Sequence, residues 1–100
     1  MYLSRLCFHT KPGRTEELEA RLGGLRTMVT AAGGSNPRIL RTHFASDESP
    51  DVIFEQEAPD LGSLERQILA VTAERDFQRW SSETSELLAR SPKREIYSVL

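Results

Sequence analysis

The chain has 100 residues, of which 38% are hydrophobic and 28% charged, and its formal net charge is −2. This length is that of one domain, and the composition is that of a globular protein rather than a disordered tail. A slightly acidic balance without a long run of one sign argues against a nucleic-acid or membrane partner. Cys7 is the only cysteine, so no intramolecular disulfide can form. Because no signal peptide or spanning segment is visible, we expect a cytoplasmic protein.

The first predicted strand covers residues 2–9 and alternates apolar with ionisable side chains. Successive side chains of a strand point to opposite faces, so Leu6 and Phe8 share one face. The other face carries Arg5, Cys7 and His9. One face of this strand is therefore expected to enter a core, and the opposite face carries the candidate chemistry.

A turn at residues 10–13 leads to a predicted helix that Thr15 caps. Its apolar positions recur at the spacing of one buried helical stripe: Leu18, Leu22, Leu25, Val29 and Ala32. Gly33-Gly34 is expected to end the helix. Gly23-Gly24 lies inside it, at a cost of roughly 1 kcal/mol per glycine, and close packing against a neighbour is one reason for tolerating the pair.

Residues 38–45 predict a second strand, with Ile39, Arg41 and His43 on one face. A third strand over residues 52–57 follows at hairpin distance and is expected to pair with it antiparallel. Its faces are Val52 and Phe54 on one side and Ile53, Glu55 and Glu57 on the other.

Asp60 is expected to cap a second helical region that contains two apolar stripes. The first stripe is Leu61, Leu64, Ile68 and Val71, and the second is Phe77, Trp80, Thr84 and Leu87. The second does not continue the phase of the first, so a break is predicted between Thr72 and Asp76. A last strand is predicted over residues 94–100, with Tyr97 and Val99 on the same face as Glu95.

This order of elements predicts an α+β protein with a ferredoxin-like βαββαβ fold. Two helices would cover one face of a four-stranded antiparallel-type sheet, and nothing in the chain is left to cover the other. The uncovered face is expected to hold Arg5, His9, Arg41, His43, Glu55 and Tyr97 among apolar neighbours. A face of this mixed character suits a homodimer joined sheet to sheet. The alternative is a monomer whose sheet face meets water.

The chain resembles the dimeric α/β-barrel superfamily, in particular its small monooxygenase-like and NIPSNAP-like members. The resemblance covers the whole chain and rests on the element order, the strand exit Lys11-Pro12-Gly13, the broken helix with Phe77 and Trp80, and the closing Glu95-Ile96-Tyr97. It implies one dimeric α/β-barrel domain over residues 1–100. It also implies a pocket between the sheet and its helices or at the barrel mouth.

The sequence departs from the catalytic pattern of that superfamily. Haem-degrading and quinone-forming members use an asparagine of the first strand together with a tryptophan, for which Trp80 could stand in. The first strand here has no asparagine, and residues 61–90 contain no histidine. This argues against haem ligation by that route and against the asparagine-dependent oxygenase mechanism, and we expect no cofactor.

His9 and His43 are the only histidines and are candidate catalytic bases, although a structural or exposed role is favoured for both. Together with Glu55 or Glu57 they could approach an iron site of two histidines and one carboxylate, but the spacing does not support a metal. Arg5 and Tyr97 are the other candidate catalytic residues. Cys7 is either a nucleophile or, as we favour, a small buried hydrophobe.

Arg41, Glu55 and Trp80 are the candidate ligand-binding residues. The arginines can hold a substrate carboxylate, but pairing of Arg5 with Glu55 across neighbouring strands is favoured. Trp80 can instead be part of the core, which its phase with Phe77 favours.

Two hypotheses about function follow. The protein is either a cofactor-independent monooxygenase-like or isomerase-like enzyme acting on a small oxygenated organic compound, or a non-catalytic ligand-binding or scaffold homodimer whose inner charges fix the interface.

Overall fold

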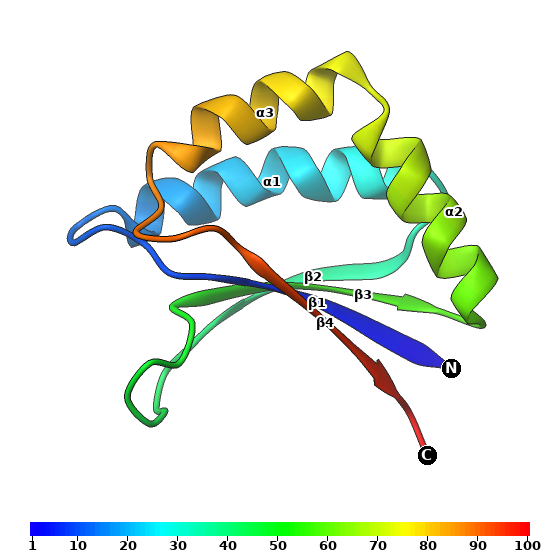
Figure 1. Cartoon of the computed structure of the whole chain (residues 1–100), viewed down its shortest axis with the longest axis horizontal. Coiled ribbons are helices and arrows are strands. Elements are labelled where there is room, and N and C mark those ends of the chain that lie inside the picture. Colours follow the sequence, from blue (N-terminus) through cyan, green and yellow to red (C-terminus); the bar gives the residue numbers. More distant parts are fainter.

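The computed structural model describes all 100 residues and has the predicted ferredoxin-like order, with the second helix in two parts (Figure 1). The elements are β1 (Tyr2–Phe8), α1 (Thr15–Ala31), β2 (Ser35–Arg41), β3 (Val52–Ala58), α2 (Leu61–Thr72), α3 (Arg75–Ser85) and β4 (Lys93–Ser98). No helix of the chain combines the length and the apolar character that a membrane crossing needs.

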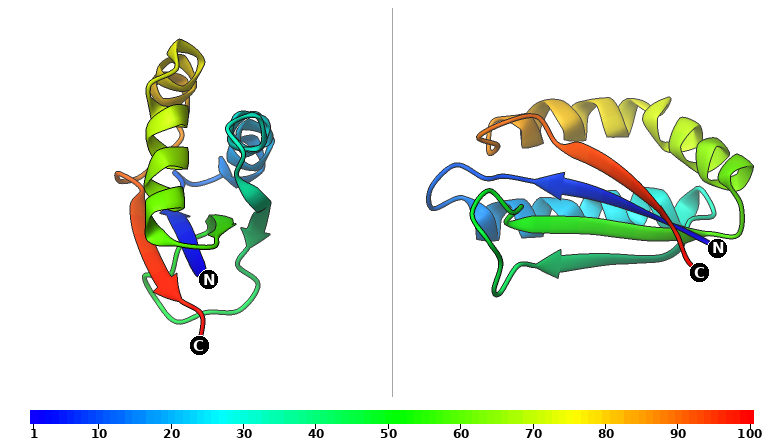
Figure 2. Two further views of the ribbon diagram at one scale, coloured as in Figure 1. Left: turned by 90° about the vertical axis from the view of Figure 1, so that its right-hand side faces the viewer. Right: turned by 60° about the horizontal axis from the view of Figure 1, so that its bottom comes forward.

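The four strands form one antiparallel sheet in the order β2-β3-β1-β4. All three helices lie on one side of this sheet, and no element of the chain covers the opposite side, which we call the open face (Figures 1 and 2). The α1 helix packs over β2 and β3, whereas α2 packs over β3 and β1. The α3 helix packs on α1 and α2 and makes no close approach to a strand, so β4 has no helix directly above it.

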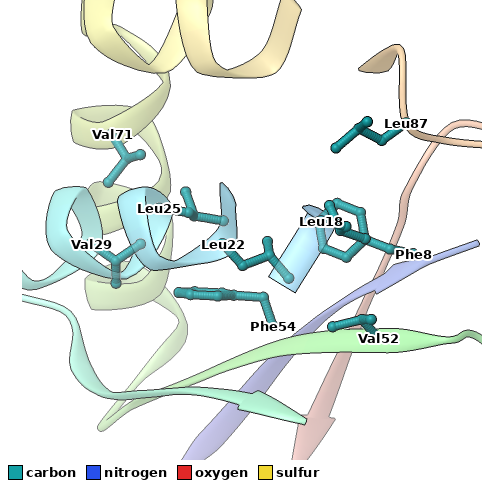
Figure 3. Packing of buried hydrophobic residues seen from close by; sticks show 9 residues of the cluster. All are labelled: Phe8, Leu18, Leu22, Leu25, Val29, Val52, Phe54, Val71 and Leu87. Atoms are coloured by element: carbon teal, nitrogen blue, oxygen red, sulfur yellow. The ribbon is translucent and has the colours of Figure 1, made fainter. Parts of the chain in front are cut away.

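The core lies between the sheet and α1, as the apolar stripe predicts (Figure 3). It consists of Phe8, Leu18, Leu22, Leu25, Val29, Val52, Phe54, Val71 and Leu87. Each of these side chains is buried, and burial of a large aliphatic or aromatic side chain contributes about 1.5–3 kcal/mol. The stripe of α1 from Leu18 to Val29 is therefore confirmed as the main contact between helix and sheet.

The predicted break of the second helix is confirmed at Ala73 and Glu74. Glu74 has an extended backbone (φ −77°, ψ 142°) and is the residue that precedes α3. The break turns the second apolar stripe back toward α1, where Phe77 and Trp80 pack against the core. Asp60 caps α2 as predicted, because its Oδ1 accepts a hydrogen bond of 2.7 Å from the Ser63 backbone N–H.

The predicted cap of α1 is wrong. Arg14 is the residue before the helix, and no side chain caps it. The Thr15 hydroxyl lies 2.8 Å from the Thr10 hydroxyl instead, because Thr15 is already inside the first turn.

The prediction for β2 is wrong in its bounds and in its faces. The strand runs from Ser35 to Arg41, earlier than expected, with a bulge between Ser35 and Arg38. Ile39 is paired with Phe54 and Arg41 with Val52, so both face the helices rather than the open face. Arg38 and Leu40 take the open face. A shift of one residue exchanges the two faces of a strand, and β2 has apolar residues on both, so its sequence pattern does not decide the phase.

Candidate functional site

The open face carries an ion cluster at its centre. Glu55 on β3 is 2% exposed and lies between two arginines. Its Oε2 accepts a hydrogen bond of 2.7 Å from Arg5 Nε, and its Oε1 accepts one from Arg38 Nη2. Burial alone would raise the pKa of Glu55, but the two guanidinium groups outweigh it and lower that pKa below its usual range. The predicted pairing of Arg5 with Glu55 is confirmed.

Tyr97 and Cys7 lie beside this cluster. The Arg5 guanidinium stands 5.3 Å from the centre of the Tyr97 ring, a cation–π contact. The Cys7 thiol is buried and lies 3.3 Å from Glu95 Oε1, to which it donates. Burial first, and then Glu95, raise the pKa of Cys7 to about 11. A thiol that stays protonated at neutral pH is a weak nucleophile, so the environment of Cys7 is that of a small buried hydrophobe.

The histidines and Arg41 do not join this cluster. His9 follows β1, and its Nε2 donates a hydrogen bond of 2.9 Å to the Glu48 carbonyl. His43 is exposed in the loop after β2, edge-on to Phe44. Arg41 forms a bidentate pair with Glu19 of α1 on the helix side. No three side chains among histidine, cysteine, aspartate and glutamate are grouped closely enough to hold a metal ion.

Trp80 lies between α3 and α1. Its Nε1 donates a hydrogen bond of 2.7 Å to the Arg21 carbonyl, and its ring stacks on Phe77 with the centroids 5.7 Å apart. These contacts place the Trp80 ring in the helix layer, on the other side of the sheet from Arg5 and Tyr97. The predicted site residues are thus divided among the open face, the β2–β3 loop and the helix layer.

A pocket between the sheet and the helices unites residues that the sequence did not single out. We call it the helix-side pocket. It lies beneath the α2–α3 break, and most of its lining is apolar: Leu6, Leu25, Val29, Phe54, Ile68, Val71 and Phe77. Its polar lining is Gln56 of β3, Gln67 and Thr72 of α2, and Arg94 of β4. Such a combination of an apolar wall and a few polar groups is typical of small-molecule sites.

The polar side chains of α2 and β3 mostly bond to the chain itself. Gln56 donates to the amide oxygen of Gln67 over 3.1 Å, and Gln67 donates to the Gly33 carbonyl over 3.4 Å. The Thr72 hydroxyl donates to the Ile68 carbonyl. The cavity itself has a volume of about 20 Å³, and the wider space of about 300 Å³ between the lining atoms includes open solvent. A ring-sized ligand therefore enters only if lining side chains move.

One sequence signal for this pocket existed. Gln56 alternates with Phe54 and Ala58 on the covered face of β3, where a polar side chain stands out. Arg94 carried no such signal, because its place in the pocket depends on its pairing with Leu6 of β1 and on the path of α2.

Solved structures of several proteins resemble the chain over nearly its whole length. A candidate antibiotic biosynthesis monooxygenase from Bordetella bronchiseptica is 19% identical, with a TM-score of 0.70 over 99% of this chain and 96% of that one. A similar candidate from Nitrosomonas europaea is 17% identical, with a TM-score of 0.71 over 100% of this chain and 99% of that one. The chain has their ferredoxin-like fold.

A NIPSNAP-like domain protein from Burkholderia xenovorans has the same fold. It is 14% identical, with a TM-score of 0.81 over 99% of this chain and 84% of that one. No protein-family model and no curated protein matches the chain. The resemblance to monooxygenase-like and NIPSNAP-like proteins is therefore confirmed in structure, at the level of the fold.

Proposed function

We propose that the protein binds a small oxygenated organic compound in the helix-side pocket and acts on it as a monooxygenase-like enzyme without a cofactor. The observation that carries this proposal is the pocket itself, an apolar space with Arg94 and two glutamines at its wall. Its support from known proteins is the fold shared with candidate antibiotic biosynthesis monooxygenases.

The lining of the pocket argues against isomerisation by a side-chain base. An isomerase needs a group that takes a proton and returns it, and the best such groups titrate near neutral pH. The side chains around this pocket are apolar, amide, hydroxyl and guanidinium groups, and none of them is a base at neutral pH. Oxidation of a CH₂ group by O₂ to a carbonyl and one water needs no further reductant, because the substrate supplies all the electrons. Because the site has no base, a substrate with a CH₂ group acidic enough to lose its proton to water suits this reaction.

Assembly into a homodimer through the open face is part of this proposal. Tyr97 and Val99 are each 43% exposed there, and Glu55 is already buried by its two arginines. Glu55 offsets one of the two arginine charges, and Glu57, 3.7 Å from Arg38 Nη2, offsets the other. A partly apolar surface around paired charges is compatible with a protein interface. A second copy of the chain offers the same surface, as a two-fold interface requires.

The proposed activity is tested by oxygen uptake with a panel of phenols and hydroquinones, and by native mass spectrometry of the purified protein. We expect a dimer mass, a retained small molecule or a bound panel member, and oxygen uptake above the uncatalysed rate. Ile68→Phe fills the pocket and should remove binding and uptake together. Leu69→Phe is the matched control, because Leu69 is 67% exposed on the same helix. Equal oxygen uptake by the two variants would contradict catalysis in this pocket.

The second candidate function is a non-catalytic ligand-binding or scaffold homodimer. The observation that favours it is the buried Arg5–Glu55–Arg38 cluster, because matched charges can fix the register of two sheets. In that case the pocket retains a ligand without turnover, and Arg5→Ala or Glu55→Ala shifts the dimer to monomer on size-exclusion chromatography. If both variants stay dimeric and stable, the charges do not set the register.

A further inference from the structure

Arg94 lies at the edge of the sheet and reaches into the protein. It belongs to β4, the edge strand, and is paired with Leu6 of β1, so its side chain is on the helix side. Arg94 as a whole residue is exposed along the uncovered edge. The guanidinium extends inward, where Nη1 donates a hydrogen bond of 2.5 Å to the hydroxyl of Ser4, a residue that is 1% exposed. The charged end of Arg94 therefore sits at the wall of the helix-side pocket.

No carboxylate of the chain neutralises Arg94. The arginines that form ion pairs are Arg5, Arg14, Arg21, Arg38 and Arg41. Glu95, the neighbour of Arg94 in sequence, points to the open face, where it accepts from Cys7. Burial lowers the pKa of Arg94, and no nearby acid opposes this effect. Arg94 is exposed along the sheet edge, yet its guanidinium donates to buried Ser4 and has no carboxylate partner, so its remaining N–H groups are free to bind an anion.

The rest of the pocket determines what kind of anion fits. Gln56 and Gln67 each direct one amide N–H to a partner in the chain, and neither carries a charge, so Arg94 is the only charged group in the lining. The remaining wall near Arg94 is apolar, with Leu6, Phe54 and Phe77. The site thus has one cationic end and an apolar body, which suits a monoanion with an apolar remainder and disfavours phosphates and sugars.

We propose that Arg94 anchors the carboxylate of a small apolar organic acid in the helix-side pocket. The proposal rests on the proposed function, because it names the substrate class of the same pocket. The free N–H groups of the guanidinium can bind both oxygens of a carboxylate in a bidentate pair, which a lysine cannot form. The apolar part of the acid would then lie toward Phe54 and Phe77.

The test is an NMR titration of the full chain with benzoate and with benzamide, its neutral isostere. We expect benzoate to shift the amide signals of Leu6, Ile68 and Val71 and to bind at least about tenfold more tightly than benzamide. Arg94→Gln should remove this preference, because it weakens the binding of benzoate far more than that of benzamide. Arg94→Lys should keep part of the preference for benzoate, because lysine keeps the positive charge. Arg90→Gln is the control, since it removes the same charge from an exposed loop residue.

Three outcomes would overturn the inference: equal affinity for both compounds, an absence of benzoate shifts at millimolar concentration, or a preference that survives in a folded Arg94→Gln. If Arg94→Gln does not fold, two results decide the inference instead. They are the benzoate and benzamide affinities of the natural chain and the benzoate preference of Arg94→Lys. Benzoate preference without any oxygen uptake contradicts the enzyme and supports the carboxylate site. Oxygen uptake on neutral phenols without a preference for benzoate supports the enzyme and contradicts the carboxylate site.

Discussion

At the scale of single residues, Glu55 is the side chain whose chemistry depends most on its surroundings. It is a carboxylate with 2% exposure on a sheet face, and it is tolerable there because Arg5 and Arg38 each donate to one of its oxygens. The arginines themselves remain partly open, with side-chain exposures of 37% and 46%. The acid is therefore shielded from water more completely than its partners are.

Replacing Glu55 by glutamine should lower the free energy of unfolding by about 1–3 kcal/mol, because two charge-assisted hydrogen bonds are lost and two arginines are left unmatched. Urea denaturation measures this change. Glu83→Gln is the control, because its pair with Arg21 is exposed on both sides and should contribute less than about 1 kcal/mol. Equal effects of the two substitutions would mean that the buried cluster does not stabilise the fold.

The same carboxyl gives a pH dependence with a definite sign. The pKa of Glu55 is lower in the folded chain than its ordinary value of 4.5. The stabilisation from its charged form is therefore complete above that value and is lost as the pH falls through the folded pKa. The natural chain should lose stability in acid more steeply than Glu55→Gln, which has no charge to lose at this position. If the free energy of unfolding falls equally steeply with decreasing pH in the two proteins, Glu55 is not the source of this pH dependence.

At the scale of elements, the break between α2 and α3 creates the helix-side pocket. A continuous helix would carry one stripe along the sheet, whereas the extended Glu74 redirects α3 onto α1 and leaves a space beneath the junction. No proline or glycine occurs between Thr72 and Asp76, so the break follows from the change of apolar phase. The residues that line the pocket belong to both pieces of the helix.

The glycine pair in α1 is not needed for close packing. A Cβ added at Gly24 would lie 3.5 Å from Trp80 Cδ1, an ordinary contact, and one added at Gly23 would meet open space. Gly23→Ala and Gly24→Ala should each raise the free energy of unfolding by about 0.4–1 kcal/mol, because alanine restricts the unfolded chain and favours helix. Thermal denaturation measures this change in stability.

Gly33→Ala is the contrast and should destabilise the protein, because Gly33 has φ +87°. If Gly24→Ala destabilises the protein, the added Cβ lies too close to Trp80, and the expected gain in stability is wrong.

At the scale of the whole molecule, the sheet has one covered and one uncovered face. Among the apolar side chains that remain exposed, Met1, Tyr97 and Val99 lie near the β4 edge of the open face, whereas Ile96 is paired with Ser4 and lies on the helix side. Met1 and Val99 are neighbours there, joined by a backbone hydrogen bond of 2.9 Å, and both termini lie at this end of the molecule (Figure 1). Exposed apolar residues gathered in one region mark an interaction surface more often than scattered ones do.

Tyr97→Asp should shift the proposed dimer toward monomer, because it puts an unpaired charge on the apolar part of the proposed interface. Sedimentation equilibrium over a range of concentrations measures the shift, which we expect to be at least about tenfold in the dissociation constant. Leu69→Asp places the same charge on the exposed side of α2 and should leave the assembly unchanged. A monomeric natural chain, or a Tyr97→Asp variant that remains fully dimeric, would rule out this interface.

Local sequence patterns were sufficient to predict the architecture. The stripe from Leu18 to Val29 fits only a helix with one buried face, and the change of phase after Val71 predicts the break that the structure has at Glu74. The pairing of Arg5 with Glu55 followed from alternation in two neighbouring strands, since both strands have a clearly apolar face to set their phase.

The face of β2 that meets the helices and the residues that line the pocket depend on contacts between distant segments, which the sequence pattern does not show. Ile39 and Leu40 are equally apolar, so the partner strand and a bulge, rather than the sequence of β2, set which of them meets the helices. Arg94, Gln56 and Gln67 are separated along the chain and meet because β4 pairs with β1 while α2 crosses β3. The physical reason is the same in both cases. A local pattern determines how a segment folds, but contacts between distant segments determine what its polar side chains face.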